Sequence, residues 1–138
     1  MKIEIFIDCN FDTTPPTCVF GSKHNSREQT LQTSNHVVLD FDLESDDVFN
    51  IDFVNKDDND DNVVFIKKLL VDDIDLQHFL LNGSFTPRYN KNWFDQQDPK
   101  PPLVYQPCTE LRHGGVWKIK LTTPIWKMIM EEWLNDKK

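Results

Sequence analysis

A short polar run, Asp57-Asp58-Asn59-Asp60-Asp61-Asn62, holds the densest group of oxygen ligands in the sequence. Hard cations such as calcium take roughly six to eight oxygens, which carboxylates and amide carbonyls supply. The spacing of Asp57, Asn59 and Asp61 copies the opening of an EF-hand loop. However, the sixth position is Asn62 where glycine is needed, and the twelfth is Lys68 where glutamate is needed. The run is therefore not an EF-hand.

Two interpretations of this run stay open. In the first, it forms a calcium site together with Asp72, Asp73 or Asp75, which come after the next apolar segment. In the second, it is a solvated turn whose charges keep the edge of a sheet polar. Both place it between two strands.

A second group of candidate residues is aromatic. Tyr89, Trp93 and Phe94 lie close to basic and amide side chains in a segment with no sustained periodicity. Such a mixture can stack on a sugar ring and hydrogen-bond its hydroxyls. It can equally anchor a protein partner, because interfaces are rich in Trp, Tyr and Arg, or pin the segment to its own domain. We therefore expect these three rings to contact a ligand or partner.

Catalytic motifs are missing from the sequence. It has no G-x-S-x-G, no glycine-rich phosphate loop and no H-E-x-x-H among its four histidines. Its paired carboxylates fall in predicted loops or on solvent faces, where nothing would raise one pKa for general acid catalysis. We expect a protein that is not an enzyme.

The amino-acid composition limits the kinds of partner that the chain can bind. The 138 residues carry a net charge of -8, and the pI is about 4.8, which opposes attraction to nucleic acid and to anionic membranes. No apolar run approaches the ~20 residues of a membrane span, and the N-terminus lacks the apolar core of a signal peptide. Three cysteines without a zinc-ligand spacing predict reduced thiols; a bridge between Cys9 and Cys18 is the alternative.

Alternating apolar residues predict most of the chain as strands. Between them, 21–29 is expected to be a surface loop, with an edge strand near Leu31, and 84–110 a long loop anchored by its aromatics. The short gap between the third and fourth strands predicts an antiparallel hairpin. The strands are expected at 2–8, 17–20, 37–43, 49–54, 63–66, 69–81 (with a bulge or bend) and 116–121.

The C-terminal segment predicts a helix over 124–135. Thr123 suits the N-cap and Pro124 the first helical position. An apolar stripe of period 3.6 follows, which we expect to pack on the sheets, with docking on a neighbouring subunit as the alternative; it comprises Ile125, Trp126, Ile129, Met130, Trp133 and Leu134. The predicted fold class is all-β: one domain, 1–138, forming an antiparallel, jelly-roll-like β-sandwich with this one helix.

Several short motifs occur in a fixed order from Phe49 onward. They are Val54-Asn55-Lys56-Asp57, the strand Val71–Leu76, the segment Asn82–Tyr89 with Trp93, Gly115-Val116-Trp117, and Thr123-Pro124-Ile125-Trp126. With the first strand, this order resembles a group of small proteins encoded by tailed phages of marine bacteria, especially T4-like cyanophages. Those proteins are in turn distantly similar to calcium-dependent xylan-binding modules.

The resemblance implies a structural or accessory protein of a virion, such as a capsid decoration, head fibre or tail component, assembled in the host cytoplasm. Its partners would be other virion proteins or further copies of itself. The alternative that it implies is a calcium-dependent carbohydrate-binding module that attaches the particle to a surface polysaccharide. By the same similarity, calcium would be the one candidate cofactor, with metal ligands from Asp57, Asp58, Asp60 and Asp61.

Overall fold

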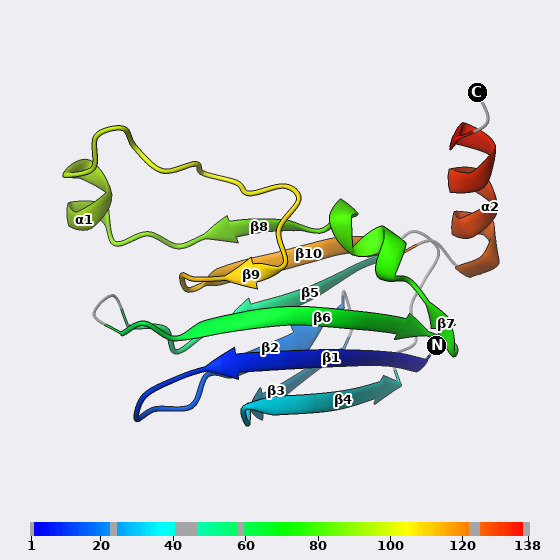
Figure 1. Cartoon of the computed structure of the whole chain (residues 1–138), viewed down its shortest axis with the longest axis horizontal. Coiled ribbons are helices and arrows are strands. Elements are labelled where there is room, and N and C mark those ends of the chain that lie inside the picture. Colours follow the sequence, from blue (N-terminus) through cyan, green and yellow to red (C-terminus); the bar gives the residue numbers. More distant parts are fainter. Residues whose placement is uncertain (1, 23–24, 41–46, 58–59, 122–124, 137–138) are drawn as a thin grey trace.

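The computed structural model describes residues 2–22, 25–40, 47–57, 60–121 and 125–136. The chain is an all-β sandwich of two antiparallel sheets, and its helices are short and lie outside the sheets (Figure 1). This confirms the predicted fold class.

The first sheet is built around β1 and β6. Its strand order is β4-β1-β6-β7, and β9 pairs with the opposite end of β6 from β7. Ile3, Ile5 and Ile7 of β1 are fully buried while their neighbours are partly exposed, as the alternation predicts. The strands are β1 (Lys2–Asn10), β4 (Ser34–Asp40), β6 (Val63–Val71), β7 (Ile74–Asp75) and β9 (Glu110–Leu111).

The second sheet has the order β3-β2-β5-β10-β8. Its central strand is β5, and β10 lies between β5 and the edge strand β8. One cluster of buried residues fills the space between the two sheets; from this sheet, Phe49, Ile51, Phe53, Trp117, Ile119 and Leu121 are at most 1% exposed. The strands are β2 (Thr17–Gly21), β3 (Ser26–Thr30), β5 (Asp47–Phe53), β8 (Ser84–Pro87) and β10 (Gly115–Leu121).

Two predictions about pairing are wrong. The segment 21–29 is not all loop, because Ser26–Thr30 pairs with β2 as the edge strand β3. Likewise, β4 and β5 do not form a hairpin: β4 pairs with β1 in the first sheet, whereas β5 pairs with β2 and β10 in the second. The chain therefore crosses between sheets here, which a short gap in the sequence does not reveal. Residues 41–43 of the predicted third strand lie outside the described ranges.

The region predicted as a bent strand over 69–81 contains three elements. The strand β6 continues to Val71, a two-residue turn leads into β7, and a 3-10 helix, η1 (Gln77–Asn82), follows. The predicted loop 84–110 likewise contains β8, the short helix α1 (Lys91–Asp95) and β9. These elements are too short to give a clear period in the sequence.

Trp117 fixes the position of the 84–110 segment on the sandwich. Its indole Nε1 donates to the carbonyl of Cys108 at 2.8 Å, which satisfies the one polar group of an otherwise buried side chain. Gly83, just before β8, packs on the indole so closely that a Cβ there would overlap the ring. Core packing therefore holds both ends of the segment.

The C-terminal helix α2 (Ile125–Asp136) only partly packs on the sandwich. Met128 and Ile129 contact the core, but Met130, Trp133 and Leu134 are 47–51% exposed. The prediction that the whole stripe packs on the sheets is therefore wrong for these three. Ile125 and Trp126 also belong to the predicted stripe, but their side chains are not among those that the structure describes.

The three cysteines are free thiols, so the prediction of reduced cysteines is confirmed and the Cys9–Cys18 bridge is wrong. Burial raises the pKa of the Cys18 thiol to about 12. Within the described ranges, no helix is both long and apolar enough to cross a membrane.

Candidate functional site

Three neighbouring strands of the second sheet end at one place. The strand β10 runs antiparallel to both β5 and β8, and its first residue, Gly115, lies opposite Phe53 and Pro87. The backbone N–H of Arg88 donates to the Gly114 carbonyl at 2.6 Å, and Arg88 Nη2 donates to the Phe53 carbonyl at 2.9 Å. The connections after β5, after β8 and before β10 are thus held side by side.

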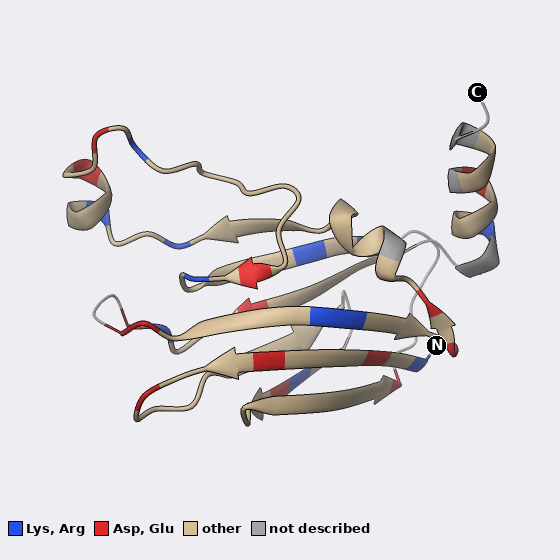
Figure 2. Ribbon diagram, in the orientation of Figure 1, with Lys and Arg blue, Asp and Glu red and all other residues tan. Residues whose placement is uncertain are grey.

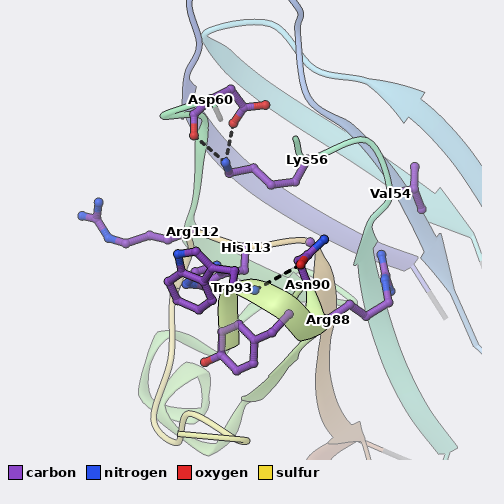
Figure 3. A pocket seen from close by; sticks show the side chains of 10 residues that line it. Val54, Lys56, Asp60, Arg88, Asn90, Trp93, Arg112 and His113 are labelled. Carbon is purple, nitrogen blue, oxygen red and sulfur yellow. Dashed lines mark hydrogen bonds and ion pairs between the residues drawn. The ribbon is translucent and has the colours of Figure 1, made fainter. Parts of the chain in front are cut away.

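These connections enclose a pocket of about 230 Å³ (Figure 3). Basic, aromatic and acidic side chains line it together. The acidic run and the aromatic segment, which the sequence singles out separately, therefore meet in one pocket. The lining residues are Val54, Lys56 and Asp60 after β5, Arg88, Tyr89, Asn90 and Trp93 after β8, and Arg112, His113 and Gly114 before β10.

Lys56 supplies an internal cation to the acidic run. Its side chain is only 7% exposed and forms an ion pair with the carboxylate of Asp60. The same Nζ donates to the backbone carbonyls of Asp57 at 2.7 Å and Asp60 at 2.6 Å. Three oxygens thus surround one ammonium group, as oxygens of a loop surround a bound cation.

Asp60 is the centre of this arrangement. Its Oδ2 accepts from the backbone N–H of Asp57 at 3.0 Å, and its Oδ1 accepts from that of Asn62 at 3.0 Å. Partial burial alone would raise the pKa of Asp60, but the hydrogen bonds from Lys56, Asp57 and Asn62 outweigh it and lower the pKa. The carboxylate therefore stays ionised at neutral pH.

Two asparagines fasten the run to the loop between β1 and β2. Asn62 is 4% exposed and donates from Nδ2 to the Thr14 carbonyl at 3.0 Å. Asn55 accepts from the backbone N–H of Thr17 at 2.7 Å and donates to the Pro15 carbonyl at 3.0 Å. Both side chains thus hydrogen-bond backbone groups in or next to this loop.

The described part of the run does not fit a calcium site. Lys56 and two backbone N–H groups already occupy the carboxylate of Asp60, while Asp57 and Asp61 are exposed. Throughout the described residues, no group of three or more His, Cys, Asp or Glu side chains is arranged to hold a metal ion. Asp58 lies outside those residues, so calcium at Asp57, Asp58, Asp60 and Asp61 stays a prediction.

A calcium site shared with Asp72, Asp73 or Asp75 is wrong. These residues follow the C-terminal end of β6, whereas the acidic run precedes its N-terminal end (Figure 1). A nine-residue strand at ~3.3 Å per residue separates the two groups by roughly 25 Å. Instead, Asp73 forms an ion pair with Lys2 at 2.9 Å.

The structure brings the three predicted aromatic residues together. Tyr89 stacks on Trp93 and on Phe94, with ring centroids 5.6 and 5.3 Å apart, and the ring of His113 meets Tyr89 edge-on at 5.0 Å. The Tyr89 hydroxyl donates to the Pro102 carbonyl at 2.6 Å and lies 3.1 Å from that of Tyr105. Burial and the contact with Tyr105 raise the pKa of Tyr89. Tyr89 is thus a fixed support for the rings around it.

Trp93 presents its ring at the pocket. It belongs to α1, where the side chain of the N-cap residue Asn90 accepts from the Trp93 backbone N–H at 3.1 Å (Figure 3). Trp93 is 38% exposed. Phe94 also stacks on Tyr89, and Lys100 Nζ lies 5.2 Å from the Phe94 ring centroid. Of the three aromatic residues, Tyr89 and Trp93 therefore line the pocket and Phe94 does not.

Sequence reasoning missed Lys56, Asn90, Arg112 and His113 as pocket residues. Lys56 precedes Asp60 by four residues, and these two opposite charges close together in the sequence could have indicated that Lys56 belongs to the site. Arg112 and His113 come just before Gly114-Gly115, but only the pairing of β10 with β5 and β8 places them here.

Known protein families, curated proteins and solved structures were compared with this chain, and none matches.

Proposed function

We propose that the chain is a non-enzymatic component of a tailed-phage virion, such as a capsid decoration, head fibre or tail protein, and that it binds a ligand through the pocket at the ends of β5, β8 and β10. The order of sequence motifs supports the virion assignment. The observation that carries the binding role is the pocket itself, in which Lys56, Arg88, Trp93 and Arg112 converge from three connections.

The chemistry of the pocket supports binding over catalysis. Its one carboxylate, Asp60, is held ionised by Lys56 and so is a poor proton donor at neutral pH. Its one histidine, His113, contacts the rings of Tyr89 and Trp93 at 5.0 and 5.7 Å.

The exposed side of α2 supports contact with a neighbouring virion protein. Met130, Trp133 and Leu134 are each about half exposed on one short helix. Large apolar side chains grouped on a surface commonly mark protein interfaces. This surface lies at the opposite end of the molecule from α1 and the pocket (Figure 1), which leaves the pocket accessible in an assembly.

The virion assignment is tested by mass spectrometry of purified particles of the encoding phage. We expect the chain at a stoichiometry comparable to that of known structural proteins, and retained after nuclease treatment and density-gradient purification. Absence of the chain from purified particles, with its presence in the infected-cell lysate, would contradict a virion role.

A second candidate function, carbohydrate binding that attaches the particle to a surface polysaccharide, is favoured by one specific observation. The exposed ring of Trp93 is supported by Tyr89 and flanked by hydrogen-bond donors, an arrangement suited to stacking on a sugar ring. A glycan array probed with the wild type and with Trp93→Ala tests it. We expect signals that disappear in the variant; an array without signals for the wild type would contradict this function.

A further inference from the structure

Each lysine, arginine and carboxylate that lines the pocket is already paired with an opposite charge of the chain. The pairs are Lys56 with Asp60, Arg88 with Asp52 at 2.8 Å, and Arg112 with Glu110 at 2.9 Å. Acidic and basic positions accordingly occur together on the connections around α1 and before β10 (Figure 2). The guanidinium groups of Arg88 and Arg112 point away from the pocket on opposite sides (Figure 3). A charged ligand would therefore be buried without a counter-charge, which is costly, so the lining favours an uncharged ligand.

Asn90 offers such a ligand an oriented hydrogen-bond donor. Its Oδ1 accepts from the backbone N–H of Trp93 at 3.1 Å, which fixes the plane of the amide. Its Nδ2 points toward the side of the pocket on which Lys56 lies (Figure 3). Among the described residues, this Nδ2 has no hydrogen-bond partner. It is therefore available to donate to an oxygen of a ligand.

The size and the aromatic wall of the pocket indicate what kind of ligand this is. Its volume of about 230 Å³ is below the ~300–1,000 Å³ typical of pockets for drug-sized ligands, so one six-membered ring suits it better than an extended molecule. Trp93, which is 38% exposed, offers a flat ring for stacking, and Tyr89 supports it from behind at 5.6 Å. A sugar ring combines an apolar face that stacks on an indole with hydroxyls that accept from an amide.

We propose that the pocket binds one uncharged sugar unit at the end of a glycan chain, with the ring stacked on Trp93 and a hydroxyl oxygen accepting from Asn90 Nδ2. The inference rests on the carbohydrate-binding role above and adds the charge and the number of the sugar units bound, with the residue that orients the bound unit. Lys56 and Arg88 instead hold the connections in place, through the carbonyls of Asp60 and Phe53.

Isothermal titration tests the charge and the number of sugar units. The ligands are the methyl glycosides of glucose, galactose and mannose, those of the corresponding uronic acids, and the neutral tetrasaccharide of the sugar that binds. We expect a neutral glycoside to bind, and its uronic acid to bind about tenfold or more weakly because its carboxylate meets no unpaired cation. The tetrasaccharide should bind within about threefold of the methyl glycoside, since only one unit enters the pocket.

Asn90→Asp tests the donor. The variant keeps the side-chain oxygen that caps α1 but loses Nδ2, so it should bind the neutral glycoside about fivefold or more weakly. Asn92→Asp is the matched control, because it makes the same change of charge on α1 at an exposed residue that does not line the pocket. It should leave the affinity unchanged. Near-ultraviolet circular dichroism checks that each variant is folded.

Each part of the inference can fail separately. A uronic acid that binds as tightly as its neutral glycoside would overturn the uncharged class. A tenfold gain from methyl glycoside to tetrasaccharide would overturn the single unit, and equal affinities of Asn90→Asp and Asn92→Asp would overturn the role of Asn90. If no glycoside bound while the glycan array gave signals, the inference would fall and carbohydrate binding would stand. An empty array would remove both.

Discussion

The ammonium group of Lys56 forms an ion pair with the carboxylate of Asp60, four residues later, inside the connection between the two sheets. Two backbone carbonyls complete the shell of oxygens around the ammonium group. An acidic run that resembles a metal-binding loop in sequence is therefore organised by a cation from its own chain.

Replacing Lys56 should destabilise the fold. Lys56→Met keeps most of the side-chain volume but leaves the Asp60 carboxylate and two carbonyls without their shared donor, which should cost about 1–3 kcal/mol. The free energy of unfolding in urea measures this. Lys68→Met is the control: its ion pair with Asp75 spans 3.9 Å and is exposed, so its loss should change stability by less than about 0.5 kcal/mol. Equal effects of the two variants would contradict the structural role of Lys56.

Stability should fall in acid partly through Asp60. Its pKa in the folded chain is lowered from the ordinary 3.8, so the unfolded chain takes up the proton first as pH falls. The contribution of Asp60 is therefore present above about pH 4 and is lost as pH falls through its lower folded pKa. Urea unfolding between pH 6 and pH 2 measures this. Asp60→Asn should show a shallower decline over that range; identical slopes would contradict the lowered pKa.

Calcium should have no effect on stability. A ligand at 100 times its Kd adds about 2.7 kcal/mol to the free energy of unfolding, so a real site would raise Tm clearly at millimolar calcium. The Asp60 carboxylate already has an ion pair with Lys56 and hydrogen bonds from two backbone N–H groups. We therefore expect differential scanning calorimetry to give the same Tm with calcium and with a chelator. A rise in Tm that Asp61→Asn removes would show that the run does bind the metal.

The adjacent glycines Gly114 and Gly115 should respond differently to alanine. At Gly114 a Cβ would meet its nearest neighbours, Phe53 O and Lys56 Cβ, at 3.4 and 3.6 Å, so Gly114→Ala should fold normally and place a methyl group in the pocket lining. Gly115 has a φ of 158°, and a Cβ there would overlap the backbone of β8.

We therefore expect Gly114→Ala to keep its stability and lose affinity for the ligand, and Gly115→Ala to lose about 1–3 kcal/mol or more of stability from overpacking. Thermal unfolding and ligand titration of the two variants separate these effects. If Gly114→Ala bound as tightly as the wild type, the ligand would lie elsewhere.

Strands with one buried face could be predicted from the sequence. In β1 and β10 the apolar residues alternate cleanly, because one face of each packs in the core. The sequence predicts an edge strand near Leu31, but the bounds of β3 could not be predicted. Its residues are mostly exposed and carry no alternation, so its pairing with β2 through backbone hydrogen bonds defines it. Pairing between distant strands also decides that β4 and β5 lie in different sheets.

The parts of the candidate site were visible in the sequence, but their arrangement was not. Tyr89 and Trp93 stand out because aromatic residues are unusual in a segment without periodicity. Their meeting with Lys56 and Arg112 depends on Gly115 lying opposite both Phe53 and Pro87. Such a register is set by contacts between residues far apart in the chain, which residue types and local spacing do not encode.

The central claim, that the pocket at the ends of β5, β8 and β10 binds the ligand, is tested most directly by ¹H–¹⁵N NMR mapping of the glycan that gives the strongest signal on the array. We predict that the largest shift changes fall on the Trp93 indole N–H and the backbone amides of Arg88 and Gly114, and that Trp93→Ala abolishes them. Changes centred on the edge strands β3 and β4, or no changes at millimolar ligand, would contradict the account.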